Sequence, residues 1–194
     1  MPAMPAASSA PDLPGAPGPG APGAVIGRLG AAELAAAAGQ LGGLLVDAVA
    51  DGSSVGFLDP LDPDAAAGWW RSLAAGVDDG SIVLWAARDG ERLLGTVQLR
   101  LNTMPNSRHR AELAKLIVHS DARGRGLGRE LLRHAEQEAP ALGVGLLLLD
   151  TQSGSPAERL YASAGWTRLG SVPDYAADPA GVLHPTTFFH KSLA

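Results

Sequence analysis

Glycines and arginines alternate in residues 121–130, which read Asp-Ala-Arg-Gly-Arg-Gly-Leu-Gly-Arg-Glu. The segment follows an apolar stretch that predicts a strand, and it precedes a stretch that predicts a helix from Leu127. Glycines at alternate positions let the backbone turn its N–H groups into one concavity, where the helix also presents its positive end. The segment therefore predicts a pyrophosphate-binding loop, formed by Arg123, Gly124, Arg125, Gly126, Leu127, Gly128 and Arg129.

Two other phosphate loops are excluded by spacing. A Walker loop needs Lys and then Ser or Thr after its last glycine, but Gly128 is followed by Arg129 and Glu130. A Rossmann fingerprint read from Gly124 needs a glycine where Arg129 stands. A flexible Gly/Arg turn without a ligand remains the alternative. This alternative explains the segment less well, because the charge, the glycine spacing and the strand–helix context all agree with phosphate binding.

Tyr161 lies in a segment that predicts a short helix. Ser155, Pro156 and Glu158 form a capping-box pattern with proline at the first helical position, and Gly165 provides the stop. Tyr161 shares one helical face with apolar neighbours. By this pattern alone it is a core aromatic residue.

Acidic side chains stand on two of the expected strands. Glu112 and Lys115 interrupt the apolar stretch 111–118, and strict alternation predicts that they point to opposite faces. Asp150 ends the strand 144–149, where ligands of α/β sheets gather. Either carboxylate is suited to bind a cation or to accept a proton. The alternatives are a solvated strand-end carboxylate for Glu112 and a turn cap for Asp150.

Periodicity and turn signals predict an α/β fold with a mixed sheet. The strand at 109–119, the helix at 127–139 and the strand at 144–150 form a βαβ unit, so the two strands should be parallel and close. The expected strands are 24–29, 81–88, 92–101, 109–119, 144–150, 166–172 and 186–191, and the expected helices are 31–50, 64–77, 127–139 and 156–164. Residues 1–23, rich in Pro, Ala and Gly, predict a disordered tail before one domain at 24–194.

Composition narrows the classes of function. The net charge of −5 argues against a nucleic-acid surface. The absence of cysteine removes a thiol nucleophile, and the histidines do not cluster, so no metal is expected. No apolar stretch suggests a membrane span and no signal peptide is visible, which makes a cytoplasmic location the default. The preference for Arg over Lys, with abundant Ala and Gly, suggests a bacterial genome.

Two motifs carry a family resemblance. Arg123, Gly126 and Gly128 match the R/Q-x-x-G-x-G/A motif of the GNAT superfamily of N-acetyltransferases, and residues 157–166 resemble its A-x-x-L-Y-x-x-x-G-F/W segment. The resemblance runs from Val25 to the C-terminus. Within it, residues 148–175 look like the tabtoxin-resistance acetyltransferase subgroup. Gly154 stands where the family often has Asn.

The resemblance implies a fold, a co-substrate and a mechanism. The sheet should be mostly antiparallel with the parallel unit at its centre and helices on both faces. Acetyl-CoA should bind with its pyrophosphate on the loop amides and its pantetheine arm along Leu116, Ile117 and Val118. Tyr161 would be the general acid that protonates the departing thiolate. Glu112 lies roughly 30–35 Å before the loop along a straight strand, near or just beyond the thioester.

The acceptor is expected to be a primary amine of a small molecule. It would attack the thioester directly, with Tyr161, Glu112 and Asp150 as the catalytic residues. A peptide or protein N-acetyltransferase and a non-catalytic acyl-CoA sensor are the alternatives. Neither a nucleic acid nor a membrane is expected as a partner, and a homodimer is left open.

Overall fold

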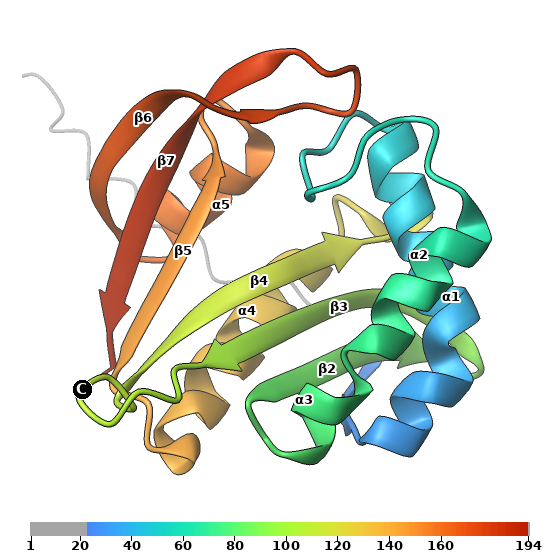
Figure 1. Ribbon diagram of the computed structural model, residues 1–194, viewed down its shortest axis with the longest axis horizontal. Helices are drawn as coiled ribbons and strands as arrows, with labels where there is room; N and C mark the ends of the chain where they lie inside the picture. The colour runs from blue at the N-terminus through green and yellow to red at the C-terminus, as the bar shows by residue number, and fades with distance from the viewer. Residues whose placement is uncertain (1–22, 194) are drawn as a thin grey trace, which may run out of the picture.

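The computed structural model describes residues 23–193, which form a seven-stranded sheet in the order β1-β2-β3-β4-β5-β7-β6 (Figure 1). The strands are β1 (Val25–Leu29), β2 (Ile82–Asp89), β3 (Arg92–Leu101), β4 (Arg110–Val118), β5 (Leu146–Gln152), β6 (Thr167–Ala177) and β7 (Leu183–Ser192). Strands β4 and β5 pair in parallel, and the other neighbours pair antiparallel. The expected mixed, mostly antiparallel sheet with a parallel pair at its centre is confirmed. Apart from Gly23, the expected tail lies outside the described residues.

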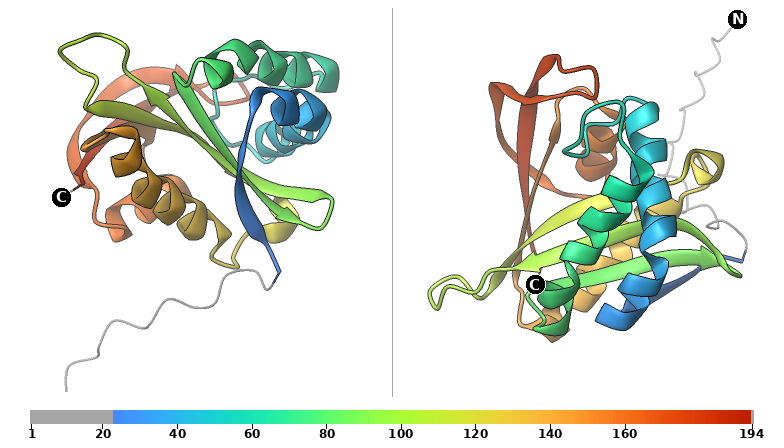
Figure 2. Two further views of the ribbon diagram at one scale, coloured as in Figure 1. Left: turned by 90° about the horizontal axis from the view of Figure 1, so that it is seen from below. Right: turned by 45° about the vertical axis from the view of Figure 1, so that its right-hand side comes forward.

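Helices cover both faces of the sheet (Figure 2). They are α1 (Ala31–Ala50), α2 (Pro63–Ser72), α3 (Ala74–Asp78), α4 (Leu127–Glu138) and α5 (Pro156–Ser163), with 3-10 turns at Ser120–Ala122 and Ala139–Leu142. Leu131 and Leu132 of α4 pack into a core on one face. Leu41 of α1 and Trp70 of α2 pack into a second core on the other face, where the Trp70 indole N–H donates to the Leu41 carbonyl at 2.9 Å.

Helix α1 corrects the expectation that no segment is long enough to cross a membrane. By length and composition this one helix meets that test among the described residues. The core helix of a soluble protein meets it equally well, and Leu34, Leu41 and Leu45 of α1 are fully buried against the sheet. The apolar face of α1 is therefore used in packing.

Two elements differ from the sequence prediction. The helix expected at 64–77 is broken at Leu73, whose N–H donates to the Trp70 carbonyl three residues back, so the last turn of α2 tightens before α3 begins. Strand β6 continues past Pro173, although proline favours the end of a strand. The strand lies at the sheet edge, with an irregularity between Val172 and Ala176, and such a position tolerates proline.

Strands β4 and β5 pair over a short distance and then separate (Figure 1). Their register has three residue pairs and ends where Glu112 faces Leu148. Strand β5 remains paired with β7 up to Gln152, and β4 remains paired with β3 up to Val118. Beyond Glu112, one edge of β4 therefore faces a cleft instead of a strand.

A β-bulge lies in β4 beside this cleft. Thr96 pairs with Ile117 and Gln98 pairs with Ala114, so Lys115 and Leu116 together oppose one residue of β3. Lys115 has φ 50, in the left-handed region. The prediction that Glu112 and Lys115 point to opposite faces is wrong. The bulge breaks the alternation of side chains, and both side chains line the same cavity.

Candidate active site

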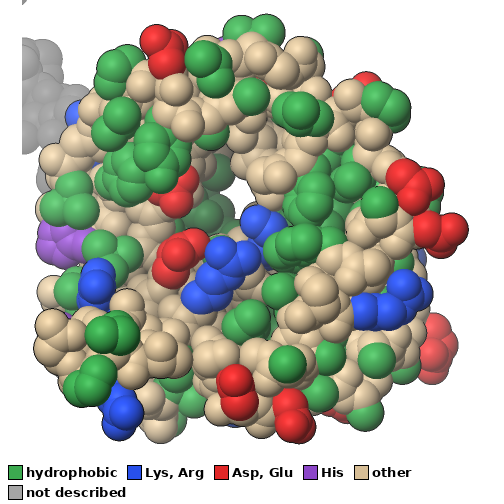
Figure 3. Space-filling view, viewed as in Figure 1, with side chains coloured by type: hydrophobic (Ala, Val, Ile, Leu, Met, Phe, Trp, Pro, Cys, Tyr) green, Lys and Arg blue, Asp and Glu red, His purple; other side chains and the backbone are tan. Residues whose placement is uncertain are grey.

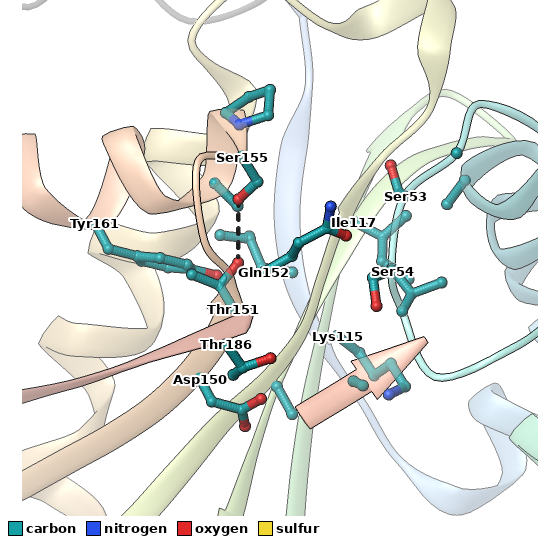
Figure 4. A pocket seen from close by; sticks show the side chains of 18 of the residues that line it. Ser53, Ser54, Lys115, Ile117, Asp150, Thr151, Gln152, Ser155, Tyr161 and Thr186 are labelled. Atoms are coloured by element: carbon teal, nitrogen blue, oxygen red, sulfur yellow. Dashed lines mark hydrogen bonds between the residues drawn. The ribbon is translucent and has the colours of Figure 1, made fainter. Parts of the chain in front are cut away.

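The cleft between β4 and β5 contains two adjoining cavities of about 550 and 680 Å³. The first lies between β4, the end of β5 and α5, and includes Tyr161 (Figure 4). The second lies beyond it, against the segment that follows α1, and includes Glu112. Lys115 and Asp150 belong to both linings. They therefore mark the boundary between the two halves of one continuous cleft.

The glycine loop presents a run of free backbone donors. Gly124 and Gly126 have φ values of 73 and 84, which favour glycine, and a Cβ on either would meet no atom within 4 Å. The first backbone bond of α4 runs from the Glu130 N–H to the Gly126 carbonyl at 3.1 Å. Within the described residues, the N–H groups of residues 124–129 have no backbone acceptor. This donor set at a helix N-terminus fits a pyrophosphate.

Arg123 and Arg129 of the loop contact different parts of the fold. The Arg123 guanidinium forms an ion pair with Asp51, lies 3.7 Å from Asp47, and donates to the Val118 carbonyl at 2.9 Å. Its contacts tie the loop to the end of α1. Arg129 donates to the Ser163 hydroxyl at 2.7 Å, which joins α4 to α5.

Asp47 of α1 also binds the segment that leads into the glycine loop. Its carboxylate accepts hydrogen bonds from the N–H of Ser120 at 2.8 Å and from the Ser120 hydroxyl at 2.6 Å. Burial opposes ionisation of Asp47, but these hydrogen bonds, together with the charges of His119 and Arg123, outweigh it, so the pKa of Asp47 is lowered. The segment that leads into the glycine loop is thus fixed to α1 by charge-assisted bonds.

The edge of β4 that faces the cleft includes the segment expected to contact pantetheine. Ile117 is buried, whereas Leu116 and Val118 are half-buried. Leu116 and Ile117 line the cavity of about 550 Å³. Because β5 has moved away, the backbone groups on this edge are available to an extended ligand, as in the addition of a strand to a sheet.

Tyr161 serves both the core and the cleft. Its ring packs against Trp166 and Phe189, with centroid distances of 5.8 and 6.2 Å, and only 6% of the residue is exposed. The side chain points from α5 into the cavity (Figure 4). Burial, and then the charge of Asp150, raise the pKa of Tyr161 well above its usual range. The hydroxyl therefore stays protonated at neutral pH.

Helix α5 is anchored by its first turn. The Ser155 hydroxyl accepts the Glu158 N–H at 3.1 Å, as the capping pattern predicts. The Glu158 carboxylate departs from that pattern, because it accepts the Gly154 N–H at 2.5 Å and the Thr187 hydroxyl at 2.8 Å. The second half of the expected capping box is thus replaced by a tie to β7, which positions Tyr161 relative to the sheet.

The two expected carboxylates lie in the same half of the cleft. Glu112 and Asp150 both line the cavity of about 680 Å³. Glu112 has an Arg100 nitrogen 3.8 Å from its carboxylate. Burial in the cleft, and then the charge of Glu112, raise the pKa of Asp150, although Lys115 opposes this. Proximity of the two carboxylates makes this half of the cleft attractive to an ammonium group.

Sequence reasoning missed Lys115 and Arg100 as site residues. Lys115 was visible as a charge in an apolar strand, whereas Arg100 gave no signal. The Lys115 ammonium lies over the Trp69 ring at 5.2 Å from the centroid. Burial, and then Arg100, lower the pKa of Lys115, while Glu112 and Asp150 oppose the shift. Within the described residues, neither Lys115 nor Asp150 has an ion-pair or hydrogen-bond partner by side chain.

The segment that forms most of this cleft matches a known protein family. Residues 51–166 match the model of the Acetyltransferase (GNAT) family, which is more than half of the chain. The chain belongs to the GNAT acetyltransferase family. The matched region of this acetyltransferase runs from the end of α1 to Trp166 and includes β4, the glycine loop, β5 and α5.

Solved structures share the fold along almost the whole length of this acetyltransferase. The yncA protein of Salmonella typhimurium, solved with its cofactor acetyl-CoA, is 21% identical, with a TM-score of 0.68 over 89% of this chain and 95% of that one. The ribosomal-protein-alanine N-acetyltransferase of Brucella melitensis is 24% identical, with a TM-score of 0.69 over 87% and 99%. An N-acetyltransferase of Staphylococcus aureus Mu50 is 17% identical, with a TM-score of 0.71 over 88% and 99%.

Proposed function

We propose that this acetyltransferase moves the acetyl group of acetyl-CoA to a primary amine of a small molecule. The observation that supports this most is the continuous cleft between β4 and β5. Arg123 of the glycine loop and Tyr161 line its first half, and Glu112 and Asp150 line its second half. The likeness of residues 148–175 to the tabtoxin-resistance subgroup agrees with a small acceptor.

Acetyl-CoA supplies the thioester, and residues of the chain orient it. The loop amides of residues 124–129 hold the pyrophosphate, and the free edge of β4 pairs with the pantetheine arm. A backbone N–H near the bulge polarises the thioester carbonyl. Formation of the C–N bond and cleavage of the C–S bond leave a thiolate, which the Tyr161 hydroxyl reaches from α5. Its raised pKa keeps the Tyr161 hydroxyl protonated, so it can donate a hydrogen bond and then a proton to the sulfur, and the proton that leaves the new amide nitrogen restores the hydroxyl.

The amine must lose a proton before it attacks, and Asp150 is the base that we propose. A base with a pKa closer to neutrality accepts a proton more readily, and Asp150 has the raised pKa. Glu112 lines the same cavity as Asp150, and we propose that it binds the ammonium form. Ordered water between Asp150 and the amine would carry the same proton.

An assay for free thiol tests the function directly. The protein is incubated with acetyl-CoA and a library of amines, and thiol release is measured together with the acetylated product. We expect release that depends on a small amine and fails with thioesters whose pyrophosphate is removed. Release only with peptides would transfer the proposal to a peptide N-acetyltransferase. Tight binding of acetyl-CoA without any release would identify a sensor.

A further inference from the structure

Four charged side chains, two acidic and two basic, surround the acceptor half of the cleft. Leu113 and Leu149 pack into the core beneath α4, so the alternating Glu112 and Asp150 point to the opposite face of the sheet. Arg100 is the register partner of Glu112 on β3 and shares that face. Figure 3 shows acidic and basic side chains gathered around a central hollow on this face.

The two cations flank the acidic pair from different sides. Lys115 shares the cavity of about 680 Å³ with Glu112 and Asp150. Arg100 shares a neighbouring cavity of about 450 Å³ with the same two carboxylates. An acceptor that contacts Glu112 and Asp150 through its ammonium group therefore has a cation within reach on either side.

The contacts of Arg100 and Lys115 indicate which charged group an acceptor would have to supply. Arg100 reaches Glu112 through Nη1 at 3.8 Å, which is longer than a charge-assisted hydrogen bond. Its Nε and Nη2 donate to the Gln98 side-chain oxygen at 3.0 and 3.3 Å, so Nη1 is the nitrogen left for an acceptor. Lys115 has only the Trp69 ring as a close partner among the described residues, although the surrounding protein partly desolvates it. An acceptor with an amine alone would engage Glu112 and Asp150, the nearby anions, and leave this ammonium without an anion of its own. A carboxylate on the acceptor would provide one.

We propose that the acceptor is a compact zwitterion of the amino-acid type, with an unsubstituted carboxylate close to its amine. This inference rests on the proposed function. The ammonium group contacts Glu112 and Asp150, and the carboxylate contacts Lys115, with Arg100 as a second donor. The charges of the four side chains cancel, so the site matches a ligand with one charge of each sign.

The walls of the acceptor half suit an apolar substituent. Phe57 and Trp69 meet edge to face at 5.4 Å on the side of α2. Tyr175 and Phe188 meet edge to face at 5.2 Å on the side of β7. Phe57 lines one cavity, and Tyr175 and Phe188 line the other. We therefore expect the amino acids that react fastest to have an aliphatic or aromatic side chain.

The experiment compares each acceptor with relatives that lack only the negative charge. L-amino acids are assayed for thiol release beside their α-amides and the amines left by decarboxylation, for example L-leucine, L-leucinamide and isoamylamine. We expect kcat/KM to be at least about tenfold higher for the acid than for either relative. The amide has the less basic amine and deprotonates more easily, so a preference for the acid cannot come from amine pKa.

Variants assign the preference to its residues. Lys115→Gln should reduce the ratio of acid to amine at least about fivefold, mainly through KM for the acid, and Arg100→Gln should reduce it less. Arg28→Gln, an exposed arginine on β1 at the other edge of the sheet, is the matched control and should leave the ratio unchanged. Stabilisation by acetyl-CoA verifies that each variant is folded.

The outcomes separate this inference from the proposed function. Equal kcat/KM for acid, amide and amine, or a ratio that Lys115→Gln does not change, would overturn the zwitterionic acceptor while leaving the acetyltransferase function intact. Absence of thiol release with every acid and every amine of a wider library would overturn the function, and the inference with it.

Discussion

Tyr161 combines a core ring with a hydroxyl directed at the cleft, so its two roles are separable by one atom. Tyr161→Phe keeps the contacts with Trp166 and Phe189 and removes only the donor. We expect kcat to fall on the order of 10²-fold, with little change in acetyl-CoA affinity or melting temperature. Steady-state kinetics with the best acceptor provide the measurement. Turnover at the parent rate would make the tyrosine purely structural.

The pH dependence of activity should identify the base. Asp150 must be ionised to accept a proton, and its pKa is raised, so kcat/KM should fall as pH drops through a value above the usual ~3.9 for aspartate. Asp150→Asn should lower kcat about 10²-fold and remove that acid limb. Glu112→Gln should act mainly on KM for the amine. If Glu112→Gln loses the limb and Asp150→Asn retains it, the two roles are exchanged.

At the scale of elements, the glycine loop depends on both backbone conformation and charge. Gly126→Asp introduces a negative side chain into the segment 124–129, whose N–H groups have no backbone acceptor, so acetyl-CoA binding should weaken at least about 10²-fold. Gly143→Asp is the matched control, because Gly143 also has a positive φ, of 77, is exposed, and precedes the start of β5, at the end of that strand opposite to the cleft. Calorimetric titration with acetyl-CoA measures the difference. Equal effects of the two substitutions would point to backbone strain alone.

The junction between α1 and the loop makes a different prediction. If Arg123 holds the loop by binding Asp47 and Asp51, its removal and theirs should weaken acetyl-CoA binding non-additively. We expect Arg123→Gln and Asp47→Asn to couple by at least about 0.5 kcal/mol in a double-mutant cycle on Kd. Strict additivity, with the larger loss from Arg123→Gln, would indicate that Arg123 contacts phosphate directly.

The sequence predicted the elements whose signals are local, and the loop and α5 are the best examples. Glycine spacing defines the N-terminus of α4, and Ser155 and Pro156 define the start of α5. The bulge at Lys115 was not predictable, because it depends on how β3 pairs with β4. The set of residues in the acceptor half was not predictable either. Arg100, Glu112 and Asp150 come from three strands, and only the tertiary structure determines how far apart these strands lie.

For the whole molecule, the separation of β4 from β5 divides the sheet around one ligand-sized space. Strands β1 to β4 continue as one paired surface, and β5, β7 and β6 form another, with three residue pairs between them. The core beneath α4 includes residues from both parts, such as Leu99 and Phe189. The arrangement keeps the two surfaces together while leaving β4 with an open edge.

The open edge of β4 has a consequence for solvent exchange. Backbone amides that point into the cleft lack the strand that would protect them, so their hydrogens should exchange quickly with deuterium in the free protein. Coenzyme A lying along that edge would take the place of the missing strand and slow the same amides, while those facing β3 would change little. Deuterium uptake, followed by mass spectrometry in peptides that contain Leu116 and Ile117, would therefore report occupancy of the cleft even for a ligand that cannot react.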